Sequence, residues 1–516
     1  MRFQDVSQGS RRFPGHRRIR PYLRRLITVG PHLSGTRRVA ARVGVPAVVG
    51  VLVVAGCGPS RPATSSAPAH AASHTAGRVA GLWRMDGYGL LVTVGKGKLR
   101  TYETTRTSCL PGTLRGTERT PGRRAGAAAV SGTRTYDVAD AAPVTLEPRG
   151  AGEARLRFAD GVGWRTLHRI TELPRRCAQK PEDDPRAVFD VFWRTYAENY
   201  PFFARRGVDW QAARARWRPK VTRDTSDARL FAILRAMIAP LHDAHTALIA
   251  GERRYAGRRQ GTPAPTPQSI ARIDKATSRA VGVPLHTWGQ GAVSFADLPD
   301  GTGYLRLTRL QDLTDKGDFA GDTRTMDKAL DKVFTAHRVR RMKGLIVDVR
   351  FHAGGSDRLG LRVAARLTDR AYRAYAKRAR NDPADPRGFT AEQPVTVRPH
   401  HGPVFTGPVA VLTGRLTVSA GETFTQALLD RRSAPVLIGE NTQGVFSDTM
   451  ERSLPGGWSF VLPNEEFRTR GGRTFDVTGI PPRHRTPVFT EEEFAHHRDS
   501  ALGLARHLLG GRRPEG

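Results

Sequence analysis

Two segments of this chain have the pattern of a buried strand that leads through a turn into a helix. In the first, the apolar run 344–349 precedes the glycine pair Gly354-Gly355, and a helical pattern follows over residues 359–367. In the second, the apolar run 409–412 precedes Ser419, which opens another helical pattern. Strands that alternate with helices in this way predict an α/β core.

Ser419 stands at the corner between a strand and a helix. Unpaired amides and the helix dipole favour negative charge there, which suits a nucleophile. A second interpretation needs no chemistry, because Ser419 and Glu422 have the spacing of a capping box, in which both side chains bond to helix amides. The local sequence leaves both interpretations open.

The glycine pair Gly354-Gly355 also has two interpretations. Glycine lets the backbone approach a ligand closely, and amides at the start of a helix can hold a developing oxyanion. Most Gly-Gly pairs, however, are only tight turns. A functional role for this pair therefore depends on the rest of the chain.

His245 is the candidate general base. It lies in the segment 240–248 (PLHDAHTAL), at the end of an amphipathic helical pattern over residues 230–237. A lone histidine in such a place is more often a packed or capping side chain than a base. With His242 it also forms a His-x-x-His pair, but two ligands do not make a zinc site and no further ligand set stands out nearby. We therefore expect neither a metal nor a cofactor.

Together these segments resemble the S41 family of serine peptidases, which includes the tail-specific or C-terminal processing group and its tricorn-like branch. The resemblance covers residues 185–510. Residues 348–355 (DVRFHAGG) are similar to the family's Asp-Leu-Arg-x-Asn-x-Gly-Gly element, and residues 417–422 (TVSAGE) to its nucleophile motif. Further similar segments follow the family's order: 200–203 (YPFF), 208–210 (VDW), 241–248 (LHDAHTAL), 437–444 (LIGENTQG) and 476–480 (DVTGI).

The resemblance implies an α/β core of the ClpP/crotonase-like type with a helical N-terminal subdomain. It also implies a role for each matching residue in peptide hydrolysis. These roles are the nucleophile for Ser419, its base for His245, an oxyanion site for Ala420 with Gly354 or Gly355, orientation of the histidine for Asp476, and positioning of the helix start for Glu422.

Departures from the family pattern indicate the branch. Members with a serine-lysine dyad have a lysine at the position of Val445, and no lysine follows Lys377 in this chain. The histidine-using members instead carry an Asp-Gly-His-Thr motif, which residues 243–246 (DAHT) resemble. Three further departures bear on activity: His352 replaces an asparagine, Asp476 a glutamate and Arg483 an aspartate.

Three functions are compatible with this sequence. The first is a serine endopeptidase that hydrolyses extracytoplasmic peptides or unfolded proteins. The second is a catalytically inactive relative that keeps the fold and binds a peptide or an apolar ligand. The third is an esterase that uses the same serine.

Residues 1–57 have the composition of an export signal. Residues 1–42 hold eleven arginines and one acidic residue, and the apolar run 43–55 follows. Thirteen apolar residues are too few to span a bilayer, which takes about 20, so this run predicts a signal peptide. Residues 54–57 (VAGC) resemble a lipobox, which would make Cys57 the lipidated N-terminus on the outer face of the bacterial cell membrane.

The next part of the chain predicts a tether and a small domain. Residues 58–80 are rich in Ala, Ser, Thr, Pro and His, which indicates a disordered linker. Short alternating stretches follow, so we expect residues 81–178 to form a small all-β domain. An even pair of cysteines in an exported protein indicates one disulfide, between Cys109 and Cys177, with two free thiols as the alternative.

The remaining chain divides into two parts. Residues 183–279 predict a helical subdomain, which ends in a polar, Pro/Thr/Arg-rich mobile loop over residues 251–279. Residues 280–510 predict the α/β catalytic core. The segment between these parts leaves too little room for the PDZ module of many S41 relatives.

The chain is strongly basic, which bears on its partners. Its formal charge is +35 over 516 residues, and residues 1–42 supply +10 of it, as eleven arginines less one aspartate, so about +25 remains. Such a charge favours anionic surfaces such as lipid headgroups or cell-wall polymers. Nucleic acid is the rival partner, but the export signal argues against it, and an arginine-rich codon bias would give the same composition.

Overall fold

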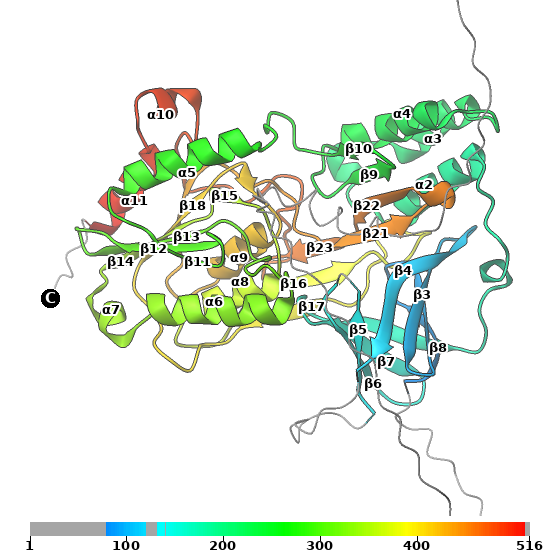
Figure 1. Cartoon of the computed structure of the whole chain (residues 1–516), viewed down its shortest axis with the longest axis horizontal. Helices are drawn as coiled ribbons and strands as arrows, with labels where there is room; N and C mark the ends of the chain where they lie inside the picture. The colour runs from blue at the N-terminus through cyan, green and yellow to red at the C-terminus, as the bar shows by residue number, and fades with distance from the viewer. Residues whose placement is uncertain (1–78, 120–131, 140, 511–516) are drawn as a thin grey trace, which may run out of the picture.

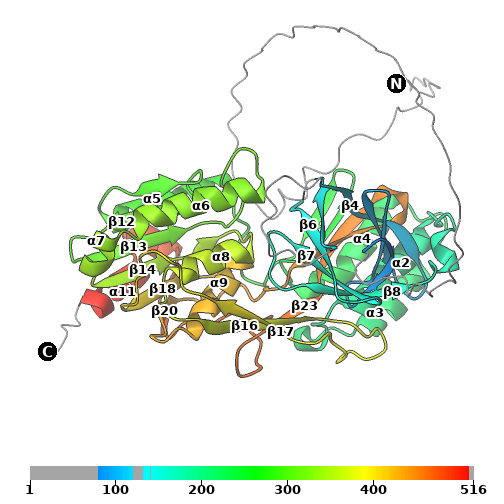
Figure 2. The same cartoon turned by 90° about the horizontal axis from the view of Figure 1, so that it is seen from below.

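The computed structural model describes residues 79–119, 132–139 and 141–510 of the chain. The expected signal peptide, Cys57 and nearly all of the expected tether lie outside the described residues. A β-barrel and the helices α2–α4 make up one half of the molecule, and a larger α/β unit makes up the other (Figures 1 and 2). Within the described ranges, none of the helices combines the length and the apolar character that crossing a bilayer takes.

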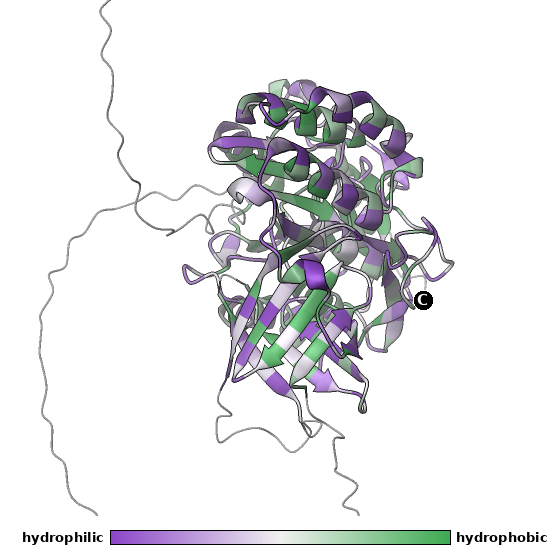
Figure 3. Ribbon diagram, turned by 90° about the vertical axis from the view of Figure 1, so that its right-hand side faces the viewer, coloured by the Kyte–Doolittle hydropathy of each residue, from purple (hydrophilic) through white to green (hydrophobic). Residues whose placement is uncertain are grey.

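The first half begins with a closed barrel of eight antiparallel strands in sequence order, in which β1 also pairs with β8. Buried and partly buried positions alternate along strands such as Val144–Pro148, because successive side chains point to opposite faces. Figure 3 shows the resulting stripes of apolar and polar residues. The strands are β1 (Gly81–Met85), β2 (Leu90–Gly95), β3 (Lys98–Thr104), β4 (Cys109–Glu118), β5 (Arg134–Val138), β6 (Val144–Pro148), β7 (Glu153–Phe158) and β8 (Arg165–Ile170).

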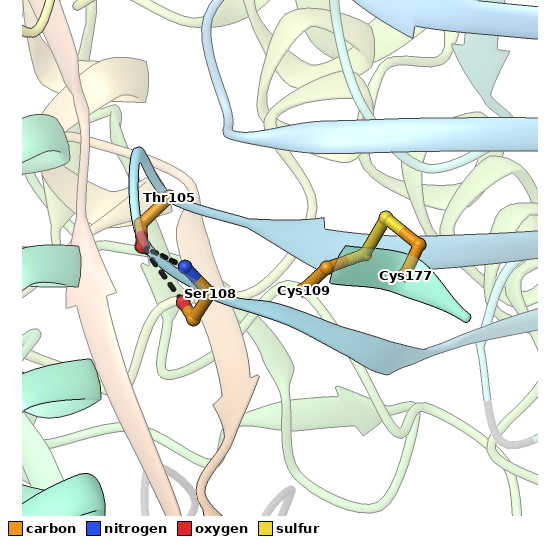
Figure 4. The surroundings of a disulfide bond; sticks show 4 residues. All are labelled: Thr105, Ser108, Cys109 and Cys177. Carbon is orange, nitrogen blue, oxygen red and sulfur yellow. Dashed lines mark hydrogen bonds between the residues drawn. A yellow bond between two sulfur atoms is a disulfide. The ribbon is translucent and has the colours of Figure 1, made fainter. Parts of the chain in front are cut away.

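A disulfide joins the barrel to the connection that leaves it (Figure 4). Cys109 is the first residue of β4, and Cys177 ends the short 3-10 helix η1 (Arg175–Cys177). Just before Cys109, the Thr105 hydroxyl accepts a hydrogen bond from the Ser108 amide at 3.1 Å and closes the turn between β3 and β4. The expected all-β domain over residues 81–178 is thus an eight-stranded barrel with one disulfide.

Three helices follow the barrel: α2 (Pro185–Asn199), α3 (Trp210–Trp217) and α4 (Asp227–Ile238). Each begins after a side chain that accepts a bond from a helix amide, namely Asp184, Asp209 and Ser226. They pack beside a four-stranded sheet in the order β10 (Arg253–Ala256), β9 (Ala247–Ala250), β22 (Ser459–Pro463) and β21 (Thr449–Ser453). The barrel interior, α2, α4 and β22 contribute to one hydrophobic cluster.

The prediction of a loop over residues 251–279 is wrong for most of that segment. It holds β10 and most of helix α5 (Pro267–Val281), and residues 257–266 between them have neither helix nor strand. The helix begins with a capping box between Thr266 and Ser269, and Pro267 stands at its first turn, where proline is tolerated. Its many charged residues cover the exposed face, while Ile273, Thr277 and Val281 are buried.

A seven-stranded mixed sheet forms the centre of the second half. β13, β14, β18, β20 and β24 are parallel neighbours, and β11 and β12 extend the sheet antiparallel. The order is β11 (His286–Trp288), β12 (Val293–Asp297), β13 (Thr302–Leu307), β14 (Gly344–Asp348), β18 (Val409–Thr413), β20 (Val436–Gly439) and β24 (His484–Arg485).

Helices cover both faces of this sheet. Leu345 and Val347 belong to the cluster that includes α6, α8 and α9, whereas Ile346 between them belongs to the cluster that includes α11. A strand with both faces covered has a continuous apolar run, as the sequence of β14 does. The helices of this half are α5, α6 (Phe319–Val333), α7 (Ala336–Arg341), α8 (Asp357–Ala365), α9 (Ala420–Leu429), α10 (Glu491–Ala495) and α11 (Ser500–Gly510).

Two smaller sheets complete the fold. β15 (Phe351–His352) pairs with β19 (Leu416–Thr417), and β17 (Gln393–Val397), β16 (Tyr372–Ala379) and β23 (Glu465–Arg468) form a three-stranded sheet. The three-stranded sheet lies between the two halves of the molecule (Figures 1 and 2). The remaining 3-10 helices are η2 (Ala204–Arg206), η3 (Arg218–Lys220), η4 (Ala239–Leu241) and η5 (Pro455–Gly457).

Candidate active site

Strand register brings the glycine loop against Ser419. β14 and β18 are parallel neighbours, so the loops at their carboxyl ends leave the sheet side by side. β15 and β19 then pair in parallel, with His352 opposite Thr417. Two residues beyond that pair, a Cβ built on Gly354 would lie 3.0 Å from Ser419 Cβ and 3.5 Å from Ser419 Oγ. The two segments that the sequence singled out therefore touch.

Ser419 has an unusual backbone conformation. Its φ is 56° and its ψ is −120°, and it immediately precedes α9. A positive φ costs free energy for a residue with a side chain, and such strain is concentrated at functional sites. The residue is partly exposed. The corner thus keeps a strained serine next to the amino end of a helix.

The Glu422 carboxylate ties the start of α9 to a second segment. It accepts hydrogen bonds from the amides of Ser419 at 3.2 Å, Gly444 at 2.6 Å and Val445 at 2.9 Å. The side chain is fully buried, and this burial raises the pKa of Glu422 to about 7. The bond to the Ser419 amide is that of a capping box, so Glu422 has a structural role whatever the chemistry of Ser419.

The amides of Gly354 and Gly355 point in different directions. The Gly354 amide donates to Nδ1 of His352 at 3.0 Å. The Gly354 carbonyl accepts from Leu310 at 2.8 Å, and in a trans peptide the next amide points the opposite way. The Gly355 amide therefore points away from Leu310. Ala420 provides the first amide of α9, which by its position has no partner within the helix.

A tight turn fixes the position of His245. Asp243 Oδ1 accepts from the His245 amide at 2.8 Å, and the Asp243 carbonyl accepts from the Thr246 hydroxyl at 2.7 Å. The other carboxylate oxygen of Asp243 accepts from the Tyr200 hydroxyl at 2.8 Å and pairs with Arg206 at 3.1 Å. Asp243 is itself buried, so the turn holds the main chain of His245 in a fixed position.

Burial lowers the pKa of His245, and the negative charges of Asp243 and Asp448 oppose that shift. The imidazole is therefore neutral near pH 7, which is the form that can accept a proton. Its side chain is 3% exposed, and its Nδ1 has no hydrogen-bond partner within the described part of the chain.

One short segment links Ser419 with His245. The amides of Gly444 and Val445 bind Glu422, the carboxylate that also holds the Ser419 amide. Two residues further along, the main chain of Ser447 interacts with the imidazole of His245. These contacts connect the two residues through residues 444–447, but among the hydrogen bonds of the described residues none joins the Ser419 hydroxyl to the His245 imidazole.

Asp476 lies in a network of main-chain amides. Its carboxylate accepts from the amides of Phe446 and Phe467, each at 3.3 Å, and from the Thr474 hydroxyl at 2.7 Å. Burial raises the pKa of Asp476 to about 8, with a further contribution from the charge of Glu422. Among the hydrogen bonds of the described residues, none joins Asp476 to the imidazole of His245.

Lys377 is close to this region but is engaged as a cation. Its Nζ donates to Asp448 at 3.0 Å and to Glu465 at 3.1 Å, and these two carboxylates raise its pKa against the effect of burial. A protonated lysine cannot accept a proton from a serine. At the position of the dyad lysine, Val445 is buried.

The barrel reaches the glycine loop. The Ser356 hydroxyl, next to Gly355, donates to the carbonyl of Asp160 in the β7–β8 loop at 2.5 Å. In the same loop, the Trp164 amide donates to the Gln393 side chain at 2.7 Å, and that side chain donates back to the Trp164 carbonyl at 2.6 Å. No local sequence pattern predicts these contacts, because such a pattern does not indicate which loops lie together in the fold.

A buried ion-pair network supports the glycine loop, and sequence reasoning missed it. Arg350 is 1% exposed and binds Asp348 at 2.6 Å and Asp499 at 2.6 Å. Asp348 also accepts from the Tyr304 hydroxyl at 2.6 Å. The Asp-x-Arg spacing in residues 348–355 was the available signal.

Over the described residues, no three His, Cys, Asp or Glu side chains are placed to hold a metal ion.

Comparisons with known proteins bear on this site. Residues 301–485 match the model of peptidase family S41. This range contains Ser419, the glycine loop, Glu422 and Asp476. Residues 181–239 match a second model, that of the tricorn protease C1 domain. His245 lies between the two matched ranges. No curated protein matches the chain.

Solved structures are also similar to this chain. A candidate peptidase from Parabacteroides merdae is 24% identical, with 64% of this chain and 97% of that chain covered and a TM-score of 0.53. Mature CPAF in complex with lactacystin is 14% identical over 64% of this chain and 99% of that chain, with a TM-score of 0.47. The tricorn protease is 12% identical over 83% of this chain and 46% of that chain, with a TM-score of 0.38. Of these three likenesses, the first supports a shared fold, and it supports the fold alone.

Proposed function

We propose that this chain is a serine peptidase of the S41 type, in which Ser419 is the nucleophile and His245 the general base. One observation carries the proposal most directly. A partly exposed serine is held at a φ of 56° at the start of α9 and lies directly against Gly354. The match of residues 301–485 to the S41 peptidase model supports it.

The reaction follows from the chemistry of these groups. His245 takes the proton from the Ser419 hydroxyl as its oxygen attacks a peptide carbonyl. The oxyanion that forms accepts hydrogen bonds from the amides of Gly355 and Ala420, since His352 occupies the Gly354 amide. His245 then gives its proton to the leaving amine, and water hydrolyses the acyl-enzyme by the reverse sequence.

Three carboxylates support the site in this proposal. Asp243 fixes the main chain of His245, and its negative charge stabilises the imidazolium that forms during the reaction. Glu422 holds the amino end of α9 against residues 444–445. Asp476 accepts hydrogen bonds from the amides of Phe446 and Phe467. It thereby holds the main chain next to Ser447, whose backbone interacts with the His245 imidazole.

A peptide-cleavage assay tests the proposal. The purified protein is incubated with unfolded casein and with a mixture of short peptides, beside the Ser419→Ala and His245→Gln variants. We expect turnover in the parent protein and none above background in Ser419→Ala. Ester turnover without peptide cleavage would favour the esterase. Peptide binding without any turnover in the folded parent protein would favour the inactive relative.

The proposed substrates are extracytoplasmic peptides or unfolded proteins. The support is the sequence of residues 1–57, with its basic stretch, short apolar run and lipobox-like end. Lipid attached to Cys57 would hold the enzyme at the outer face of the membrane, close to anionic cell-wall polymers. Metabolic labelling with a radioactive fatty acid tests this, because the Cys57→Ala variant should remain unlabelled.

A further inference from the structure

His352 lies at the junction of the glycine loop and the serine turn. It is the last residue of β15, and its side chain is fully buried. In the S41 motif that residues 348–355 resemble, this position holds an asparagine. His352 makes contacts on two sides, with the glycine loop and with α9.

The first contact is a hydrogen bond within the glycine loop. Nδ1 of His352 accepts from the amide of Gly354, two residues further along, at 3.0 Å. Asparagine and aspartate make the same bond to the amide two residues on when they stabilise turns. The bond needs a neutral imidazole with its proton on Nε2. Burial lowers the pKa of His352 to about 3, so the ring stays neutral.

The second contact is with the first turn of α9. A Cβ built on Gly421 would lie 2.6 Å from Nδ1 and 2.7 Å from Cγ of the His352 ring. Real Cβ atoms essentially never approach other atoms so closely. Position 421 therefore has no room for a side chain, and the imidazole fills the space between the glycine loop and the helix.

We infer that His352 and Gly421 are matched in size and that His352 is a positioning residue of the oxyanion site. The ring bonds to Gly354, whose neighbour Gly355 supplies one donor, and it packs on Gly421, whose neighbour Ala420 supplies the other. The imidazole thus sets the distance between the two donors. This inference rests on the proposed peptidase function.

The role is positional because, in this inference, the imidazole acts through Gly354 and Gly421 and not on the reacting atoms. Donors stabilise an oxyanion only when each lies about 2.7 to 3.1 Å from it. A methyl group forced between the ring and α9 would separate the donors by a sizeable part of that distance. Transition-state binding would suffer more than substrate binding, because the substrate is also held elsewhere.

A double-mutant cycle tests the inference. His352→Ala removes the ring atoms Cγ and Nδ1, and Gly421→Ala adds a methyl group against those same atoms. We expect Gly421→Ala alone to lower kcat about 10- to 100-fold with little change in KM. The double variant should be much less impaired than the product of the two single effects, because alanine at position 352 removes the atoms that the methyl group would meet.

A third substitution tests the hydrogen bond alone. His352→Leu fills a similar space but offers no acceptor to the Gly354 amide. We expect its kcat to fall about tenfold or more, whereas His352→Asn, which keeps an acceptor for the Gly354 amide, stays closer to the parent protein. Unchanged kcat in His352→Leu, or effects of His352→Ala and Gly421→Ala that simply multiply in their double variant, would overturn the inference.

Thermal unfolding separates this inference from the proposed function. The melting temperature of Gly421→Ala should fall, and His352→Ala should reduce that fall in the double variant, whether or not the protein is active. If no turnover depends on Ser419, the peptidase proposal fails while this thermal coupling still tests the size match. Independent effects on the melting temperature would overturn the size match itself.

Discussion

The backbone of Ser419 holds a conformation that serine rarely adopts. A φ of 56° places the residue outside the regions that side chains favour. The Glu422 bond to its amide and the contact with Gly354 hold it there. Such strain costs on the order of 1 to 3 kcal/mol and persists only where the surroundings impose it. The free energy for this corner comes from the packing of β19, the glycine loop and α9.

Substitution of Ser419 by glycine should therefore stabilise the fold while it removes the hydroxyl. Glycine adopts a positive φ without steric cost. We expect Ser419→Gly to be more stable than Ser419→Ala by about 1 kcal/mol, measured by chemical denaturation, because left-handed backbone costs about that much for a residue with a Cβ. Equal stability of the two variants would show that the serine is not strained.

The pH dependence of turnover should report on His245. The base must be neutral, so kcat/KM falls as the pH falls through the pKa of His245, which burial lowers from its ordinary value of 6.5. The charge of Asp448 raises this pKa. Asp448→Asn should thus move the acid limb of the profile to still lower pH, while the surface variant Asp315→Asn leaves it in place. A limb that moves to higher pH in Asp448→Asn would contradict this electrostatic account.

At the scale of the elements, the end of β14 depends on a buried charge. Arg350 pairs with Asp348 and Asp499, so it fastens the glycine loop to α11. Arg350→Met would leave two buried carboxylates without their cation, and we expect a loss of about 3 to 5 kcal/mol in the free energy of unfolding. Arg272→Met, which breaks an exposed pair with Glu491, is the control and should leave stability nearly unchanged.

The sequence predicted the elements of the core better than their contacts. β14 and β18 were foreseen because strands covered on both faces have continuous apolar runs. Helix α5 was missed because its charged residues hid the spacing of Ile273, Thr277 and Val281. The pairing of His352 with Thr417 joins residues 65 positions apart in the sequence, and no local periodicity encodes it.

The same limit applies to the site residues. Ser419, Gly354 and Glu422 were proposed from motifs. In the structure, Gly354 lies directly against Ser419, and the Glu422 carboxylate accepts hydrogen bonds from the amides of Ser419 and Gly444. The positive φ of Ser419 results from tertiary packing, so propensity cannot reveal it. Asp448 lay in no recognised motif, and its proximity to His245 exists only in the folded chain.

At the scale of the whole molecule, the barrel is packed firmly against the rest of the fold. It shares a hydrophobic cluster with α2, α4 and β22. The Tyr88 hydroxyl in the barrel donates to Glu465 at 2.5 Å, and Glu465 also binds Lys377. Together with the bond between Ser356 and Asp160, these contacts hold the barrel beside the proposed site.

Removal of the barrel should consequently unfold the rest. A protein of residues 181–510 would expose the shared cluster, and we expect it to aggregate or to lack a cooperative thermal transition. The Cys109→Ser, Cys177→Ser double variant is the control. It keeps the barrel, so it should remain folded and lose about 4 kcal/mol, as expected for a loop of 68 residues. A soluble, active fragment of residues 181–510 would show that the barrel is dispensable.

The central claim is that Ser419 is an activated nucleophile, and the site of a fluorophosphonate adduct tests it most directly. The folded protein is incubated with the probe and digested, and the modified peptide is identified by mass spectrometry. We predict one adduct on Ser419, absent in Ser419→Ala and formed much more slowly in His245→Gln. A folded protein that takes up no probe, or takes it up on another serine, would contradict the account.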